Sequence, residues 1–216
     1  MDERVVEYPW FFSRLADVGK MLDAGSSFNH DFLLERPPLR GADLTIMTLA
    51  PEKRCYWHSG YSYVFGDLRN TMFADQTFNT IASISTIEHI GLDNTLLYTG
   101  NPRDAEADES GFVPAVQEFR RVIKPGGACF ISVPFGKRQN LGWYQVFDLA
   151  MVEEIVETFK PSSHQIEYFG YSRDGWSRGS AETLANATVF DIHSGKGWSD
   201  DRAASSRAIA CLQLTA

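Results

Sequence analysis

The stretch Lys20-Met21-Leu22-Asp23-Ala24-Gly25-Ser26-Ser27 decides the fold that we predict for this chain. Apolar side chains lead into an acid, a glycine and two serines, which predicts a buried strand, a tight turn and the start of a helix. Gly25 has no Cβ, so the backbone of the turn can approach a ligand closely. The Asp23 carboxylate can order the amides of the turn or bind a ligand. In open α/β sheets the ligand crevice lies at the carboxyl ends of the strands, where this turn falls. The alternative is a plain strand-to-helix turn.

Strands and helices alternate along the rest of the chain. Short apolar runs predict strands, and apolar residues at helical spacing predict helices. This alternation predicts an α/β fold with a mainly parallel sheet and helices on both faces. The predicted strands after the turn are residues 42–49, 63–68, 78–85, 128–133, 165–169 and 208–214, and the predicted helices are residues 8–18, 28–33, 113–122 and 149–159.

The composition is that of a globular protein with one sizeable core, and residues 1–216 are predicted to form a single domain. Within it, the polar segment 91–111 and the Gly/Ser/Trp-rich segment 170–205 are expected to be insertions that serve as a lid or contribute to an acceptor site.

Charge and cysteine content exclude several classes of protein. The 28 acidic against 20 basic residues give a net charge of −8, which disfavours nucleic acid as a partner. Cys55, Cys129 and Cys211 are too widely spaced for a metal pair or a disulfide framework, and the acidic run 104–109 has no metal-ligand spacing. The charged start of the chain is unlike a secretion signal, and no apolar run approaches the ~18 residues of a membrane span. We therefore expect a cytoplasmic protein without a metal site or a membrane span.

Four motifs, in this order, resemble those of the class I S-adenosylmethionine-dependent methyltransferases. Asp23 to Ser27 stands where that family has an acidic-x-Gly-x-Gly loop around the methionine part of the cofactor. Gly66-Asp67-Leu68 resembles the Gly-Asp after the third strand, whose acid commonly meets the adenine amino group. The run from Ser83 to Ile90 is similar to the end of the family's fourth strand, and the run from Phe119 to Gly127 resembles the turn before its fifth strand.

This resemblance implies a Rossmann-like, doubly wound, seven-stranded sheet whose last strand is antiparallel. It also implies S-adenosylmethionine as cofactor and S-adenosylhomocysteine as product. The implied cofactor-binding residues lie at the ends of the first four strands: Asp23, Ala24, Gly25, Ser26, Ser27, Thr48, Asp67, Leu68, Ser85, Thr86 and Ile87.

Two positions depart from the family pattern. Ser27 replaces the second glycine of the loop, and it could crowd the carboxylate end of the cofactor or donate a hydrogen bond to it. Thr48 stands where the family has an acid that binds the ribose hydroxyls. A threonine hydroxyl makes a neutral hydrogen bond in place of the stronger charge-assisted one, so weaker or absent cofactor binding is an alternative.

The candidate catalytic residues follow the fourth strand. His89 falls beside the expected methyl position, and an imidazole titrates close to neutral pH, so we predict it as the base. Glu88 would orient His89, bind a ligand or satisfy a helix start. For His89 the alternative is that it caps or packs beneath the following loop. By resemblance, the acceptor pocket would include aromatic walls and a few polar groups, and ordinary packing is the alternative for its four candidates: Trp143, Tyr144, Trp176 and Arg178.

Methyl transfer requires alignment of a nucleophile and, for a hydroxyl, removal of its proton. We therefore predict methyl transfer to a small-molecule or glycan-linked acceptor, at a hydroxyl. We include a glycan-linked acceptor because three segments also resemble a subgroup associated with polysaccharide synthesis, namely residues 88–92, the insertion and Lys124 to Gly127. The alternative is a catalytically silent methyltransferase-like partner or scaffold protein, which Thr48 and Ser27 favour. A nicotinamide-dependent enzyme is disfavoured because the turn lacks Gly-x-Gly-x-x-Gly.

Overall fold

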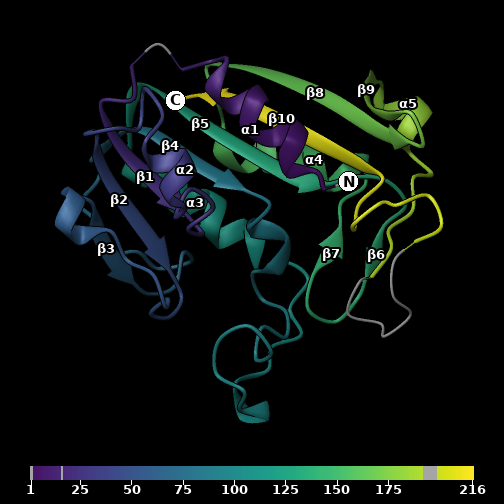
Figure 1. The fold of residues 1–216 in the computed structure, drawn as a ribbon, viewed down its shortest axis with the longest axis horizontal. Coiled ribbons are helices and arrows are strands. Elements are labelled where there is room, and N and C mark those ends of the chain that lie inside the picture. Colours follow the sequence, from purple (N-terminus) through teal and green to yellow (C-terminus); the bar gives the residue numbers. More distant parts are fainter. Residues whose placement is uncertain (1, 16, 192–198) are drawn as a thin grey trace.

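The computed structural model of the chain describes residues 2–15, 17–191 and 199–216. Helices and strands alternate through most of this length (Figure 1). The elements are α1 Arg4–Phe12, β1 Lys20–Ala24, α2 Asp31–Leu34, β2 Asp43–Thr48, β3 Ser62–Phe65, β4 Phe78–Ile84, α3 Phe112–Val122, β5 Ile123–Pro134, β6 Gln139–Asn140, β7 Gln145–Val146, α4 Leu149–Phe159, β8 Ser163–Ser172, β9 Gly175–Gly179, α5 Ala181–Leu184 and β10 Ala208–Thr215, with short 3₁₀ helices at Trp57–Ser59, Ile87–His89 and Pro102–Asp104.

An eight-stranded sheet with the order β3-β2-β1-β4-β5-β10-β8-β9 forms the centre of the molecule. The first five strands in this order pair in parallel, and β10 pairs antiparallel with both β5 and β8. The predicted mainly parallel sheet with an antiparallel last strand is therefore confirmed. The eighth strand, β9, was not predicted. Its sequence Gly175-Trp-Ser-Arg-Gly179 has no apolar alternation, and it forms by pairing with β8.

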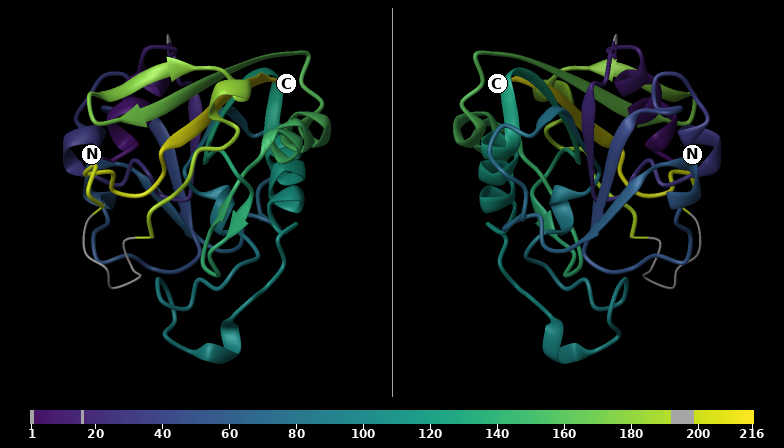
Figure 2. Two further views of the ribbon diagram at one scale, coloured as in Figure 1. Left: turned by 90° about the vertical axis from the view of Figure 1, so that its right-hand side faces the viewer. Right: turned by 90° about the vertical axis from the view of Figure 1, so that its left-hand side faces the viewer.

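The sheet separates two apolar layers, as expected when successive side chains of a strand point to opposite faces. Helices α3 and α4 cover one face, and α1 and α2 cover the other (Figure 2). The alternation is clear in β4, where Ile81 joins the layer under α3 and Ala82 joins the layer under α1. In that second layer Phe11 packs its ring 4.7 Å from Phe28 and 5.1 Å from Phe130. Burial of such a ring is worth about 1.5–3 kcal/mol.

Helix boundaries agree with the sequence prediction where a local signal sets them. Asp148 caps α4 by accepting a hydrogen bond from the Met151 amide at 3.0 Å, and the predicted range 149–159 is confirmed. The predicted helix 8–18 is wrong in its limits, because α1 spans Arg4–Phe12. Glu7 is fully buried in this helix, which holds the charged start of the chain against the sheet. In the described part of the chain, no helix has the length and apolar character required to cross a bilayer.

Candidate active site

A cavity of about 550 Å³ opens at the carboxyl ends of β1, β2, β3 and β4. In the sheet β1 lies between β2 and β4, so the chain crosses over at this point, which is where ligands bind in open α/β sheets. Of the predicted cofactor residues, six line the cavity, namely Gly25, Thr48, Asp67, Leu68, Ser85 and Thr86. The cavity lining does not include the other five, Asp23, Ala24, Ser26, Ser27 and Ile87.

Asp23 orders the turn after β1 from beneath. Its Oδ1 accepts a hydrogen bond from the Ser27 amide at 3.1 Å, and its Oδ2 accepts one from the Phe28 amide at 2.9 Å. The side chain is fully buried, and this burial raises the pKa of Asp23 to about 7 although the two amide bonds favour the charged form. Of the two roles open to Asp23, the structure gives it that of ordering the amides.

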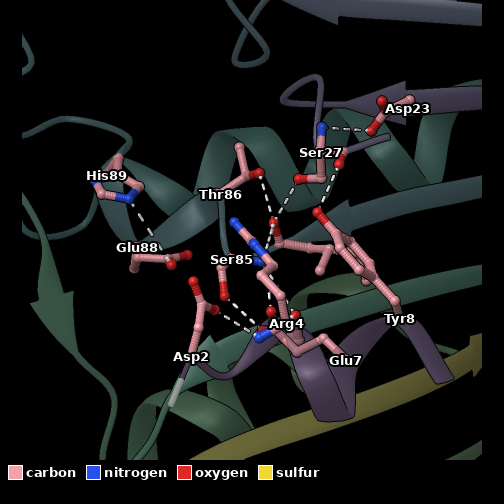
Figure 3. A network of polar contacts seen from close by, with 12 residues as sticks. Asp2, Arg4, Glu7, Tyr8, Asp23, Ser27, Ser85, Thr86, Glu88 and His89 are labelled. Carbon is pink, nitrogen blue, oxygen red and sulfur yellow. Dashed lines mark hydrogen bonds and ion pairs between the residues drawn. The ribbon is translucent and has the colours of Figure 1, made fainter. Parts of the chain in front are cut away.

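The Ser27 hydroxyl ties the turn to the neighbouring strand. Its Oγ donates a hydrogen bond to the Ile84 carbonyl at 2.6 Å, and the Tyr8 hydroxyl donates to the Ser27 carbonyl at 2.9 Å (Figure 3). Ser27 is buried by these contacts and is absent from the cavity lining. The serine at the second glycine position is therefore accommodated by β4 and leaves the cavity open.

Gly25 allows the turn to meet the end of β4 at very close range. Its φ of +117° is a conformation that favours glycine, and a Cβ at this position would lie 2.2 Å from Thr86 Oγ1. Thr86 forms the opposite wall and donates to the Ile84 carbonyl at 3.2 Å. A side chain at position 25 would therefore displace Thr86.

Glu52 supports the turn and was not found from the sequence. Its carboxylate accepts hydrogen bonds from Ser26 Oγ and, at 2.5 Å, from Asn29 Nδ2. Asn29 Oδ1 in turn accepts a hydrogen bond from the Tyr63 hydroxyl at 2.8 Å. Glu52 comes four residues after the end of β2, so an acid shortly after the second strand was the only local signal.

Thr48 lines the cavity and carries a buried hydroxyl that no described group uses. The residue is 2% exposed, and its Oγ1 has no hydrogen-bond partner among the described residues. A buried hydroxyl without a partner is costly, and its lone pairs and proton suit a ligand that carries hydroxyl groups. The residues of this wall therefore fit the ribose of a nucleoside cofactor.

Asp67 also lines the cavity but is held by a cation. Its carboxylate accepts hydrogen bonds from Arg69 Nε and Nη2, at 2.9 and 2.7 Å to Oδ2, which lowers the pKa of Asp67. The same guanidinium donates to both carboxylate oxygens of Glu106 at 2.7 Å. Since Glu106 belongs to the insertion 91–111, Arg69 joins the end of β3 to a second segment that lines the cavity.

The end of β4 is anchored to the N-terminal helix by buried polar contacts (Figure 3). Ser85 Oγ donates to Glu7 Oε1 at 2.5 Å, and Ser132 Oγ donates to the same oxygen at 2.7 Å. Arg4 Nη1 pairs with Glu7 Oε2 at 2.8 Å. Ser85 has a φ of +43°, and Ile87 is fully buried in the core under α3. This anchor sets where the next residues, Glu88 and His89, enter the site.

His89 lines the cavity with a defined arrangement of its ring protons. Its Nδ1 lies 2.9 Å from the Trp143 carbonyl, which can only accept, so Nδ1 carries the proton and Nε2 of the neutral ring carries the lone pair. Burial lowers the pKa of His89 to about 4, so the ring is neutral at pH 7. Glu88 Oε1 lies 3.9 Å from Nε2. Burial raises the pKa of Glu88 well above its usual range.

The predicted acceptor residues are found in two separate places. Trp143 and Tyr144 lie beside His89, with ring centroids 5.1 and 5.9 Å from the imidazole. Trp176 and Arg178 lie on β9 at the edge of the sheet, where Trp176 packs on Tyr171 and Arg178 pairs with Glu167 at 2.9 Å. The structure does not bring this second pair to the cavity, because the segment after β8 folds back as a hairpin.

The two predicted insertions also differ. Residues of the segment 91–111 line the cavity, and the segment extends away from the sheet (Figures 1 and 2). The segment 170–205 contains the end of β8, β9 and α5, and its residues 192–198 lie outside the described part of the chain. Only the first of the two therefore meets the cavity within the described residues.

No protein-family model matches the sequence, and no curated protein matches it. The structure is similar to several solved methyltransferases. The similarity to a SAM-dependent methyltransferase from Thermotoga maritima covers 98% of this chain and 88% of that one, with a TM-score of 0.57 and 13% sequence identity. The similarity to the N-methyltransferase NodS of Bradyrhizobium japonicum, in complex with S-adenosylhomocysteine, covers 99% of this chain and 86% of that one. Its TM-score is 0.56 and the sequence identity is 13%.

A third similar structure is the 1,6-didemethyltoxoflavin N1-methyltransferase of Burkholderia thailandensis, with S-adenosylhomocysteine bound. It has a TM-score of 0.56 and 12% identity over 96% of this chain and 75% of that one. Some other neighbours are longer, and the chain covers 52% of their length. The chain therefore has the Rossmann-like fold of the class I S-adenosylmethionine-dependent methyltransferases.

Proposed function

We propose that this chain is an S-adenosylmethionine-dependent methyltransferase that acts on a small-molecule or glycan-linked acceptor. The observation that carries the proposal is the cavity at the crossover of the sheet, whose lining includes Gly25 and Thr48, and the Thr48 hydroxyl has no partner among the described residues. Both suit a nucleoside cofactor, because one allows close approach of the backbone and the other offers a hydrogen bond to a ribose. The fold and three neighbours described as methyltransferases support the same assignment.

Three parts of the cavity wall would hold the cofactor. Thr48 would bind the ribose, Asp67 with Leu68 would face the adenine, and Gly25 with the Ser85–Thr86 backbone would flank the methionine part. When bound, S-adenosylmethionine supplies a methyl group activated by its sulfonium. The remaining task of the protein is to place the acceptor and manage its proton.

His89 is the proposed proton acceptor for the hydroxyl acceptor predicted from the sequence. Its neutral ring presents the Nε2 lone pair, since Nδ1 is occupied by the Trp143 carbonyl. With a pKa lowered to about 4, the imidazole stays unprotonated and available at neutral pH, although it is a weaker base than a free imidazole. Trp143 and Tyr144 pack next to it but do not line the cavity, so they hold the imidazole in place and would meet an acceptor only if they moved.

A catalytically silent partner protein is the second candidate, and the Asp67–Arg69 ion pair favours it. The acid expected to meet the adenine amino group is already paired with a guanidinium. If this pair persisted with ligand present, adenine would gain little from Asp67.

Calorimetric titration with S-adenosylmethionine, S-adenosylhomocysteine and NADH separates these functions. We expect micromolar binding of the first two and none of NADH. Gly25→Ala should abolish this binding, because its methyl would meet Thr86, whereas Gly175→Ala is the matched control. Gly175 has a similar φ of +111° and open space around its Cβ position. No binding of either sulfur ligand at millimolar concentration would favour the silent protein.

A further inference from the structure

Two hydrogen-bond acceptors face each other beside the cavity without a donor between them. Glu88 Oε1 and His89 Nε2 are 3.9 Å apart, which is too long for a direct hydrogen bond. The lone pair on Nε2 follows from the bond of Nδ1 to the Trp143 carbonyl. A single donor atom about 2.8–3.0 Å from each would bridge this gap with good geometry.

The number of protons on the bridging atom decides its chemistry. A hydroxyl has one proton, so it can donate to Glu88 or to His89 but not to both. A nitrogen with two or more protons can donate to both at once. The other oxygen of Glu88, Oε2, also has no hydrogen-bond partner among the described residues, although the residue is only 2% exposed. The pair is therefore better matched to an amine than to an alcohol.

The surrounding charges favour a cation at the same place. The groups that act electrostatically on Glu88 come from the N-terminal segment (Glu3, Arg4 and Glu7), and Tyr144 and His89 lie on its other sides. Arg4 is committed to Glu7 at 2.8 Å and to the Ile84 carbonyl at 3.1 Å. Glu3 Oε2 is buried without a hydrogen-bond partner in the described part of the chain. This leaves more buried carboxyl groups than cations, which a bound ammonium would offset.

We infer that the methyl acceptor presents a primary or secondary amine, and that Glu88 Oε1 and His89 Nε2 together hold its nitrogen. Glu88 itself does not line the cavity, whereas its neighbour His89 does. Figure 3 shows Glu88 between His89 and Ser85, so the nitrogen would reach it past the imidazole of His89. This inference rests on the proposed function and replaces the hydroxyl oxygen predicted from the sequence with nitrogen as the acceptor atom.

Glu88 is then the group that manages the amine proton. The acceptor arrives as an ammonium, and one proton moves from its nitrogen to the Glu88 carboxylate, which leaves a neutral nitrogen with a lone pair. Burial and Glu7 raise the pKa of Glu88, which brings its proton affinity closer to that of an amine.

The test compares amines with alcohols of the same shape, in the absence of any cofactor analogue. Calorimetric titrations at pH 7 would use ethanolamine against ethylene glycol and benzylamine against benzyl alcohol. We expect at least one amine to bind ten-fold or more tightly than its alcohol.

Glu88→Gln should remove the amine preference, since it keeps the shape of the side chain and loses the charge. Glu154→Gln, on the exposed side of α4, is the matched control and should keep the preference. If Glu88→Gln does not fold, Glu88→Asp should keep the charge and lower the preference, because the shorter side chain widens the gap to His89. Equal binding of amine and alcohol in both pairs, or a preference that survives Glu88→Gln, overturns the inference.

A separate titration with S-adenosylhomocysteine keeps the two proposals distinguishable. A chain that binds this ligand but shows no amine preference overturns the amine site alone. A chain that prefers amines and binds neither sulfur ligand overturns the proposed function and leaves the amine site standing.

Discussion

Two buried acids lie at the ends of neighbouring strands and use their oxygens in opposite ways. Asp23, in β1, gives one oxygen to each of two backbone amides. Glu88, just after β4, has an oxygen without a hydrogen-bond partner among the described residues. Burial raises the pKa of both carboxyl groups, so desolvation does not distinguish them. The difference lies in whether the fold already satisfies the carboxylate: Asp23 maintains a turn, whereas Glu88 leaves an oxygen unused, which the amine proposal assigns to a ligand.

Removal of the Asp23 carboxylate is the strongest test of this contrast. In Asp23→Ala the amides of Ser27 and Phe28 lose their partner in a buried place, so we expect a loss of about 2–4 kcal/mol in the free energy of unfolding. Denaturant unfolding at pH 7 measures it. Glu88→Gln should stay within about 1 kcal/mol of the wild type, because no bond to the backbone of another residue depends on it. A larger loss from Glu88→Gln than from Asp23→Ala would reverse the assignment.

Gly25→Ala tests whether the turn is also held by close approach to β4. The added Cβ would lie 2.2 Å from Thr86 Oγ1, so Thr86 has to move, at a cost of about 1–3 kcal/mol beyond the strain of the positive φ. Gly175→Ala carries a comparable strain without a clash, and the difference between the two melting temperatures isolates the contact. Equal melting temperatures would mean that Thr86 yields freely.

The pH dependence of stability should separate His89 from Asp23 by its sign. The pKa of His89 is about 4 in the folded chain and 6.5 for an unperturbed imidazole, as in the unfolded chain. Between these two pH values only the unfolded chain binds the proton, so the contribution of His89 to stability is lost as the pH falls from 6.5 to 4. The pKa of Asp23 is about 7 in the folded chain and 3.8 for an unperturbed carboxyl, as in the unfolded chain. The contribution of Asp23 to stability therefore grows as the pH falls from 7 to 3.8 and is lost as the pH rises through 7. As the pH is lowered from 8 to 5, the free energy of unfolding of His89→Asn should rise by about 2 kcal/mol relative to that of the wild type. Parallel curves for the two proteins would contradict the lowered pKa.

Thr48→Val should have the smallest effect on stability and a visible effect on binding. The hydroxyl has no partner in the described structure, so its replacement by a methyl should leave the free energy of unfolding unchanged or raise it by up to about 1 kcal/mol. The affinity for S-adenosylhomocysteine should fall about five-fold, in line with the loss of one neutral hydrogen bond. A marked loss of stability would place Thr48 with Asp23 as a residue that serves the fold.

The sequence predicted what local pattern controls. Apolar runs located the strands of the parallel half, and apolar residues at helical spacing located α4. The seven-stranded expectation from the family resemblance holds except for the added β9, which depends on pairing with β8 and not on its own composition.

The candidate site was predictable only where consecutive residues carry it. Gly25, Asp67 and His89 stood in recognisable motifs and line one cavity. Glu7 reaches Ser85 across 78 positions of the chain, and Arg69 reaches Glu106 across 37. Such contacts are set by the packing of α1 and of the insertion, which no short window of sequence contains. Trp176 and Arg178 were placed by analogy alone, and the β8–β9 hairpin takes them elsewhere.

The Arg69 bridge has a kinetic consequence. Its guanidinium joins Asp67 to Glu106, and both acids are partly exposed, so each ion pair is worth about 0–1 kcal/mol and is screened by salt. A ligand whose entry or exit moves the segment 91–111 away from the end of β3 would have to part these charges. The rate of exchange, more than the final affinity, should therefore rise with ionic strength, and the residence time of a bound cofactor becomes a property that the salt content of the surroundings can adjust.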